Sequence, residues 1–206
     1  MASTAAPYGL RPVNLIGGQP YAGSTRSLLI DPAGYGTNIF NGSVVYINSS
    51  GYINIVTATG ADATTNAWPA GSSGMTGAVG VFVGCSYTNS MGQTVFGQYY
   101  PANALNGVAY VVDDPDCVFQ AQLDGSGAQT VLGSNTYFAA AQSTSTGSTT
   151  TGNSTSALTA STVTTTAPFR IVGFANNITS TVGDAYTDVL VKFNIGWHSY
   201  TTAVGL

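Results

Sequence analysis

The densest group of side chains that could do chemistry is the acidic run Asp113-Asp114-Pro115-Asp116. Three carboxylates so close together offer the hard oxygen ligands that Ca²⁺ prefers. The run lacks the alternate-residue spacing and central glycine of an EF-hand loop, and Asp-Pro segments between strands are ordinary turn material. We therefore favour a turn over a metal site, and we predict no cofactor.

The single histidine, His198, is the second candidate for chemistry. A catalytic imidazole needs a nucleophile and an orienting partner, and nothing near His198 in the sequence identifies either. Its neighbours Trp197 and Tyr200 are aromatic. We expect His198 to be a packing or interface residue.

Enzyme motifs are missing from the sequence. The patterns GxSxG, HExxH, CxxC and the P-loop do not occur. A retaining glycosidase needs two carboxyl groups about 5 Å apart, and the aspartates outside the acidic run are too dispersed to nominate a pair. We predict that the protein is not an enzyme and has no catalytic residues. A polysaccharide depolymerase remains an alternative, with Asp113 or Asp116 as its candidate residues.

Cys85 and Cys117 are the only cysteines, too few for a disulfide framework. Both lie in or beside apolar runs with strand character. We predict two free, buried thiols, rather than a bridge, in a protein made in a reducing cytoplasm.

The segments that must position these residues have the period of two that is typical of strands. In the central part of the chain, four extended runs separated by turn residues predict a β-meander over 79–83, 95–100, 108–112 and 117–123. Further predicted strands cover 27–30, 43–47, 52–56, 129–132, 137–141, 169–174 and 189–195. Asn48 to Gly51 predicts the turn of a hairpin, because Asn and Gly tolerate positive φ.

Two polar segments interrupt this pattern. Residues 57–77 predict a loop of small residues whose one large anchor is Trp68, a candidate contact residue. Residues 143–168 form a tract rich in Ser and Thr. That tract is either a flexible linker or a short helix or loop anchored by Ala157, Leu158 and Val163.

Charged side chains are scarce. They make up 6% of the 206 residues, against roughly 25% in soluble globular proteins. The net charge is −4, and the four basic residues are scattered, so we predict no nucleic-acid partner. No apolar stretch is long enough for a membrane helix, and we expect no membrane partner and no signal peptide. Such a composition suits a chain that packs against copies of itself or against a lattice.

The first 27 residues are rich in Pro and Gly, which block helices and long central strands. Apolar residues such as Tyr8 and Leu10 are interleaved with these breakers, which is unusual for a disordered tail. We predict an extended N-terminal arm over 1–27 that orders against a neighbouring subunit. Residues 28–206 are predicted to form a single all-β domain, an antiparallel barrel or sandwich with jelly-roll-like connections as one option.

Three segments resemble a family of tailed-phage virion proteins that is widespread in marine and freshwater phages, including cyanophages. They are APYGLRPVNLIGGQPYAGSTRSLLI, then VGVFVGCSYTNSMGQTVFGQYYPAN with AYVVDDPDCVFQAQLDG, and FRIVGFANNITSTVGDAYTDVLVKFNIGWH. The chain is most similar to the capsid decoration, or cement, members of that family. The similarity covers most of the chain apart from the loop around Trp68 and parts of the Ser/Thr tract.

This resemblance implies a homotrimer, made in the host bacterial cytoplasm, on the outer surface of a capsid shell of major capsid protein. The implied role is mechanical, because binding across capsomer boundaries stabilises the mature head. The alternative is a tail or head-fibre virion protein that binds host glycans. The residues that we expect at the interface are Pro7, Tyr8, Gly9, Leu10, Arg11, Pro12, Val13 and Trp68.

Overall fold

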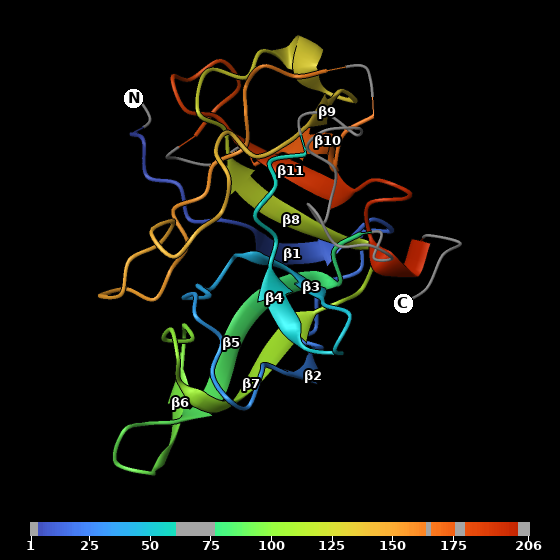
Figure 1. Ribbon diagram of the computed structural model, residues 1–206. Helices are drawn as coiled ribbons and strands as arrows, with labels where there is room; N and C mark the ends of the chain where they lie inside the picture. Colours follow the sequence, from blue (N-terminus) through green and yellow to red (C-terminus); the bar gives the residue numbers. More distant parts are fainter. Residues whose placement is uncertain (1–3, 61–76, 164–165, 176–179, 202–206) are drawn as a thin grey trace.

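Two antiparallel β-sheets pack against each other in the computed structural model, which describes residues 4–60, 77–163, 166–175 and 180–201 (Figure 1). The helices in these ranges are two short 3-10 turns, η1 (Gln129–Val131) and η2 (Ser199–Thr201). The prediction of an all-β antiparallel fold is confirmed, in the form of a sandwich. No helix of the described ranges is long and apolar enough to cross a membrane.

The first sheet has five strands. In order across the sheet the strands are β1 (Arg11–Leu15), β8 (Cys117–Gln122), β11 (Asp188–Phe193), β10 (Phe169–Phe174) and β9 (Asn135–Thr136). At its centre, β8 from the middle of the chain pairs with β11 from near the C-terminus. Val191 pairs with Phe119 and Val189 with Ala121, and all four side chains are buried. The period-two pattern of these strands therefore fills the space between the sheets.

The second sheet has six strands. In order they are β2 (Arg26–Leu29), β7 (Leu105–Val112), β5 (Gly80–Thr88), β3 (Val44–Ile47) and β4 (Ile53–Ile55), while β6 (Thr94–Gly97) pairs with β5. Val44, Val81 and Val112 belong to the core shared with the first sheet. The alternate residues Phe82 and Val111 belong to a second core, which the segment between β2 and β3 helps to cover.

The hairpin between β3 and β4 is as predicted. Val45 pairs with Ile55 and Ile47 with Ile53. The Asn48 N–H donates to the Tyr52 carbonyl at 2.8 Å, and Gly51 has a φ of +84°. A glycine at this position avoids the strain that a side chain would cause.

The predicted β-meander is wrong in its connectivity. A meander would place β6 between β5 and β7, but β5 has β7 along one edge and pairs with both β3 and β6. The fourth run, β8, belongs to the other sheet, because the turn at 113–116 carries the chain across the sandwich. Alternation shows which residues share a face, and it carries no information about which strand is the neighbour.

An N-terminal arm separate from the β domain is not confirmed, because part of the segment is a strand of the chain's own sheet. β1 pairs with β8 from Arg11, opposite Gln120, to Leu15, opposite Cys117. Leu10 is fully buried in the core between the sheets. The described part of residues 1–27 therefore contacts its own domain.

Two predicted strands and the Ser/Thr tract differ from expectation. Residues 129–132 contain η1, and residues 137–141 form only an isolated bridge from Phe138 to Leu158. Leu158 is buried and also bridges to Leu123, so it anchors the tract against the end of β8. Of the alternatives for this tract, the described residues 143–163 form an anchored loop, without a helix.

Candidate interaction surface and adjacent cleft

The second sheet extends beyond the part that the first sheet covers (Figure 1). On β7, Val112 is buried between the sheets, whereas Val108 on the same face is only half-buried. Val108 pairs with Leu29 on one side and with Ser86 on the other, and Ser86 pairs with Phe96. Directly paired residues present their side chains on one face. We call this surface, made of Leu29, Ser86, Phe96, Val108 and Tyr110, the outer face.

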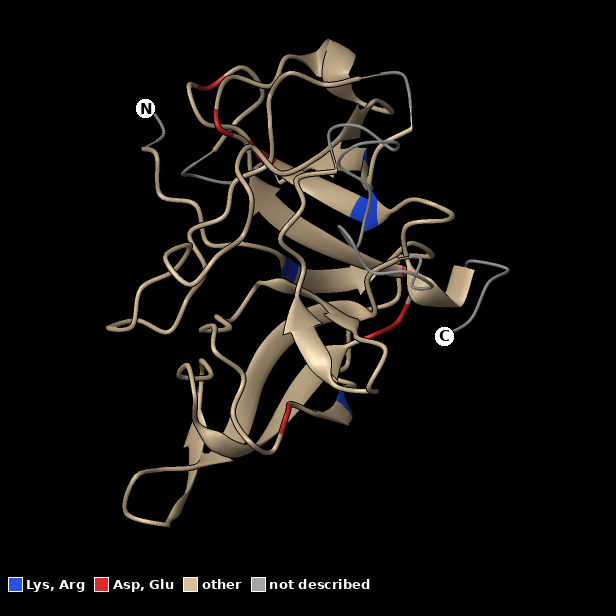
Figure 2. Cartoon of the chain, in the orientation of Figure 1, with Lys and Arg blue, Asp and Glu red and all other residues tan. Residues whose placement is uncertain are grey.

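The outer face is apolar and uncharged. Phe96 is 77% exposed and Leu29 is 58% exposed. The strands β5, β6 and β7 contain no Lys, Arg, Asp or Glu, and Figure 2 shows the projecting part of the sheet almost free of charged residues. An exposed Phe and an exposed Leu at the two ends of one uncharged cross-strand row are typical of a surface that another molecule covers.

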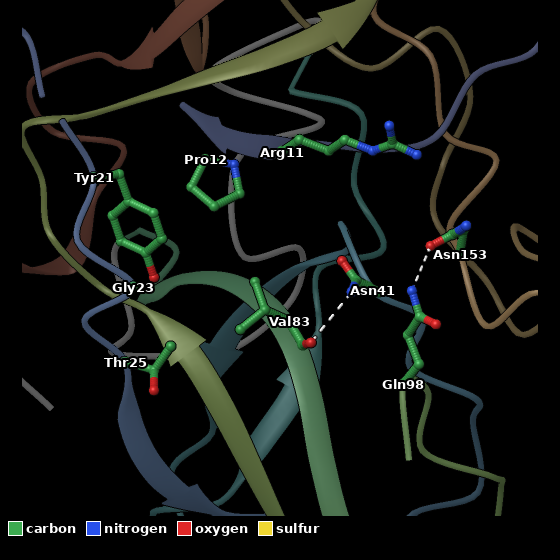
Figure 3. Close-up of a pocket in the computed structure, with 9 residues that line it drawn as sticks. All are labelled: Arg11, Pro12, Tyr21, Gly23, Thr25, Asn41, Val83, Gln98 and Asn153. Atoms are coloured by element: carbon green, nitrogen blue, oxygen red, sulfur yellow. Dashed lines mark hydrogen bonds between the residues drawn. The ribbon is translucent and has the colours of Figure 1, made fainter. Parts of the chain in front are cut away.

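A cleft of about 480 Å³ lies where β1 passes over the second sheet (Figure 3). Arg11 and the amides of Gln98 and Asn153 lie along one side, Tyr21 and Thr25 lie along the other, and Asn41 and Val83 lie between them. Of the described residues, Arg11 is the only charged one that lines the cleft. The described residues that line the cleft are Arg11, Pro12, Tyr21, Gly23, Thr25, Asn41, Val83, Gln98 and Asn153.

Hydrogen bonds fix the three amides of the cleft. The Asn41 Nδ2 donates to the Val83 carbonyl at 3.2 Å, and the Gln98 Nε2 donates to the Asn153 Oδ1 at 2.9 Å. The Asn41 Oδ1, the Gln98 Oε1 and the Asn153 Nδ2 form no hydrogen bond that the described residues show. The cleft therefore offers the two acceptor oxygens of Asn41 and Gln98 and the NH2 group of Asn153 beside a guanidinium group, and the bonded NH2 groups of Asn41 and Gln98 each keep a second N–H.

The structure places the residues of the predicted interface in different environments. Arg11 and Pro12 line the cleft, and Val13 is 43% exposed. Pro7 and Tyr8 are half-buried, whereas Gly9 and Leu10 are buried. Trp68 lies outside the described residues.

Gly9 and Leu10 have structural roles. Gly9 has a φ of +74°, and a Cβ there would lie 2.5 Å from the Gly42 carbonyl oxygen. The Leu10 N–H donates to that same carbonyl at 3.0 Å. A side chain at Gly9 would strain the backbone and push these two segments apart.

The acidic run forms the predicted turn. The Asp114 Oδ1 accepts a hydrogen bond from the Asp116 N–H at 2.8 Å. The Asp113 carboxylate lies 2.7 Å from the Arg26 Nε and accepts a hydrogen bond from the Tyr200 hydroxyl at 3.0 Å. Within the described ranges, no three His, Cys, Asp or Glu residues form a group that could hold a metal ion.

His198 is fully buried and packs against aromatic rings, as predicted for a packing residue. Its ring centroid lies 5.4 Å from that of Phe193 and 5.1 Å from that of Tyr200. The Nδ1 accepts a hydrogen bond from the Tyr200 N–H. Burial lowers the pKa of His198 to about 4, although the carboxylates of Asp113 and Asp114 oppose this shift. The imidazole is therefore neutral at physiological pH.

Cys85 and Cys117 are both free and buried, which confirms the sequence prediction. Burial raises the pKa of each thiol to about 12. Because the thiolate is the nucleophilic form, neither residue is set up for covalent chemistry.

Phe96 of the outer face and the three amides of the cleft were not identified from the sequence. Nothing in the pattern around Phe96 distinguishes an exposed strand residue from a buried one. The amides Asn41, Gln98 and Asn153 come from separate parts of the chain and meet only in the fold. Their sole sequence signal was the general abundance of polar, uncharged residues.

Comparison with known proteins yields no match to a family model, to a curated protein or to a solved structure. The resemblance to phage decoration proteins therefore stays a prediction. The function must be argued from the outer face, the cleft and the charge of the chain.

Proposed function

We propose that this chain is a capsid decoration protein of a tailed phage, which binds the outer surface of the major capsid protein shell as a homotrimer. Its role is structural and not enzymatic: it stabilises the mature head. The single observation that carries this proposal is the outer face. The sequence resemblance supplies the identity of the partner.

The outer face suits a contact between copies of the chain. In a closed cyclic trimer, a side chain near the three-fold axis meets its own copies, so a charge at that place would repel itself. The outer face contains no charge, although each chain has a net charge of −4. Covering Phe96 alone would remove on the order of 150 Å² from water, a sizeable part of the roughly 800 Å² that each partner buries in a standard interface.

A second surface, at the edge of the first sheet, is available for the shell. The exposed side chains of Arg11 and Val13 lie on β1, at the edge of the first sheet. We propose that this edge, together with Trp68, contacts the major capsid protein. A ligand that binds the expanded shell and not its precursor stabilises the expanded state by mass action, and a trimer adds avidity.

The first experiment measures mass and binding on the purified protein. Light scattering is expected to give a trimer, and co-sedimentation with expanded shells that lack this protein is expected to show saturable binding. Microscopy of labelled particles is expected to place the chain on the head. A compact monomer without affinity for shells would contradict the proposal, and a position on the tail or on head fibres would favour the alternative of a glycan-binding virion protein.

A matched pair of variants tests the two surfaces separately. Phe96→Asp places a charge on the outer face, and we expect it to prevent trimerisation. Arg11→Glu reverses the charge at the edge of β1, and we expect a trimer that binds shells more weakly. A trimer of Phe96→Asp with wild-type shell occupancy would exclude the outer face as the contact.

A further inference from the structure

The chemistry of the cleft beside β1 points to a ligand of its own, beyond the proposed function. Its volume of about 480 Å³ lies within the range of roughly 300–1,000 Å³ that is usual for small-molecule sites. A second cleft, of about 420 Å³ at the β5–β6 turn, is lined by no charged residue within the described ranges. The cleft beside β1 therefore has the more selective lining.

Arg11 determines the charge of the ligand. The Arg11 guanidinium stacks over the Tyr8 ring, 4.2 Å from its centroid, and no described residue forms an ion pair with it. Stacking restrains the plane of the group and leaves its N–H edge available for a carboxylate. Among the described residues no carboxylate lines the cleft, so its lining is positive in a chain that is negative as a whole. An opposing charge, the buried Asp188 carboxylate, interacts electrostatically with Arg11 and is not part of the lining.

The amides determine what else the ligand carries. The Asn41 Oδ1 and the Gln98 Oε1 are acceptors, and a phosphate or sulfate ion, whose oxygens only accept, would leave both of them without a donor. Hydroxyl groups donate to such oxygens and also accept from the Asn153 Nδ2. The lining thus fits a molecule with several hydroxyls and one acid group.

The apolar part of the lining fits the same class. Pro12 and Val83 provide carbon surface, and the Tyr21 ring lies on the side opposite Arg11. A pyranose ring has a C–H face that packs against such surfaces, with its hydroxyls at the rim. We propose that the cleft binds an acidic saccharide, with the carboxylate at Arg11 and ring hydroxyls at Asn41, Gln98 and Asn153.

The experiment is calorimetric titration of the wild-type protein with digalacturonic acid, its uncharged counterpart digalactose, and acetate. We expect digalacturonic acid to bind, digalactose to bind at least tenfold more weakly, and acetate not to bind at millimolar concentration. Equal binding of the two disaccharides, no binding of digalacturonic acid, or binding of acetate as strong as that of digalacturonic acid would each overturn the proposal. Because the titration needs no shell, its result is independent of capsid binding.

Two variants locate the site. Arg11→Gln removes the charge and Asn153→Asp replaces a donor with a carboxylate of the same size, and each is expected to weaken binding roughly ten- to a hundredfold. The control Arg170→Gln makes the same charge change on β10, three strands away from β1. An equal loss in the control, with all three variants folded by circular dichroism, would overturn the assignment.

Discussion

Phe96 on β6 and Leu29 on β2 lie in one cross-strand row, with Ser86 and Val108 between them. Both ends of the row are more than half exposed. On β7 the same face is buried at Val112, where the first sheet covers it. The outer face is therefore an uncovered continuation of a core face, which explains its apolar character.

Truncating Phe96 is expected to weaken self-association without destabilising the fold. Phe96→Ser removes most of an exposed apolar side chain, and changes at exposed positions alter the free energy of unfolding by about 0.5 kcal/mol or less. In sedimentation analysis we expect the trimer to dissociate at a concentration at least tenfold higher than for the wild type.

The control for this prediction is Ile195→Ser. Ile195 is 85% exposed but lies outside the outer face, after the end of β11. We expect Ile195→Ser to leave the dissociation constant of the trimer unchanged. Equal effects of the two variants would mean that general surface hydrophobicity, and not the outer face, drives association.

Leu10 and Val13 are expected to differ sharply in their effect on stability, although they lie three residues apart. Leu10 is fully buried in the core between the sheets, and Leu10→Ala should lower the free energy of unfolding by about 2–5 kcal/mol. Val13 is 43% exposed, and Val13→Ala should change the free energy of unfolding by less than about 1 kcal/mol. Urea unfolding of both variants measures this. A small effect of Leu10→Ala would show that the N-terminal segment does not pack on its own domain in solution.

The period of two was sufficient to locate most strands and their faces. Phe169–Phe174 has the predicted bounds, and Val108, Tyr110 and Val112 share a face as expected. Alternation could not show that this face is covered at Val112 and uncovered toward Phe96. Coverage depends on the position of the other sheet, which is a long-range property.

The N-terminal segment and the cleft also depend on contacts between residues that are far apart in the sequence. The density of Pro and Gly before residue 27 suggested a separate arm, yet Arg11 pairs with Gln120, more than a hundred positions away. Gln98 and Asn153 are likewise remote in sequence and are joined by a hydrogen bond. Contacts of this kind leave no local pattern, so the cleft was beyond prediction even though Arg11 and Pro12 were selected.

The two thiols are expected to be unreactive in the folded protein. Burial raises the pKa of Cys85 and of Cys117 to about 12, so at pH 8 the thiolate fraction is very small. With Ellman's reagent we expect no fast reaction in buffer and two equivalents in denaturant. Ser90→Cys, at an exposed turn position, serves as the reactive control. Fast native reaction of either natural cysteine would contradict its burial.

His198 is expected to make the protein less stable in mild acid. Burial lowers its pKa from 6.5 to about 4 in the folded state, so between these values the unfolded chain binds more protons than the folded one. The stabilisation is complete above pH 6.5 and is lost as the pH falls toward 4, by roughly 3 kcal/mol in total. Urea unfolding at several pH values gives the free energy of unfolding as a function of pH, for the wild type and for His198→Gln. Burial raises the pKa of Asp188, so this residue alone would make the protein more stable as the pH falls. Because Asp188 is present in both proteins, the difference between their two pH dependences isolates the effect of the histidine. Parallel slopes would show that His198 takes up its proton as readily in the folded protein as in the unfolded chain.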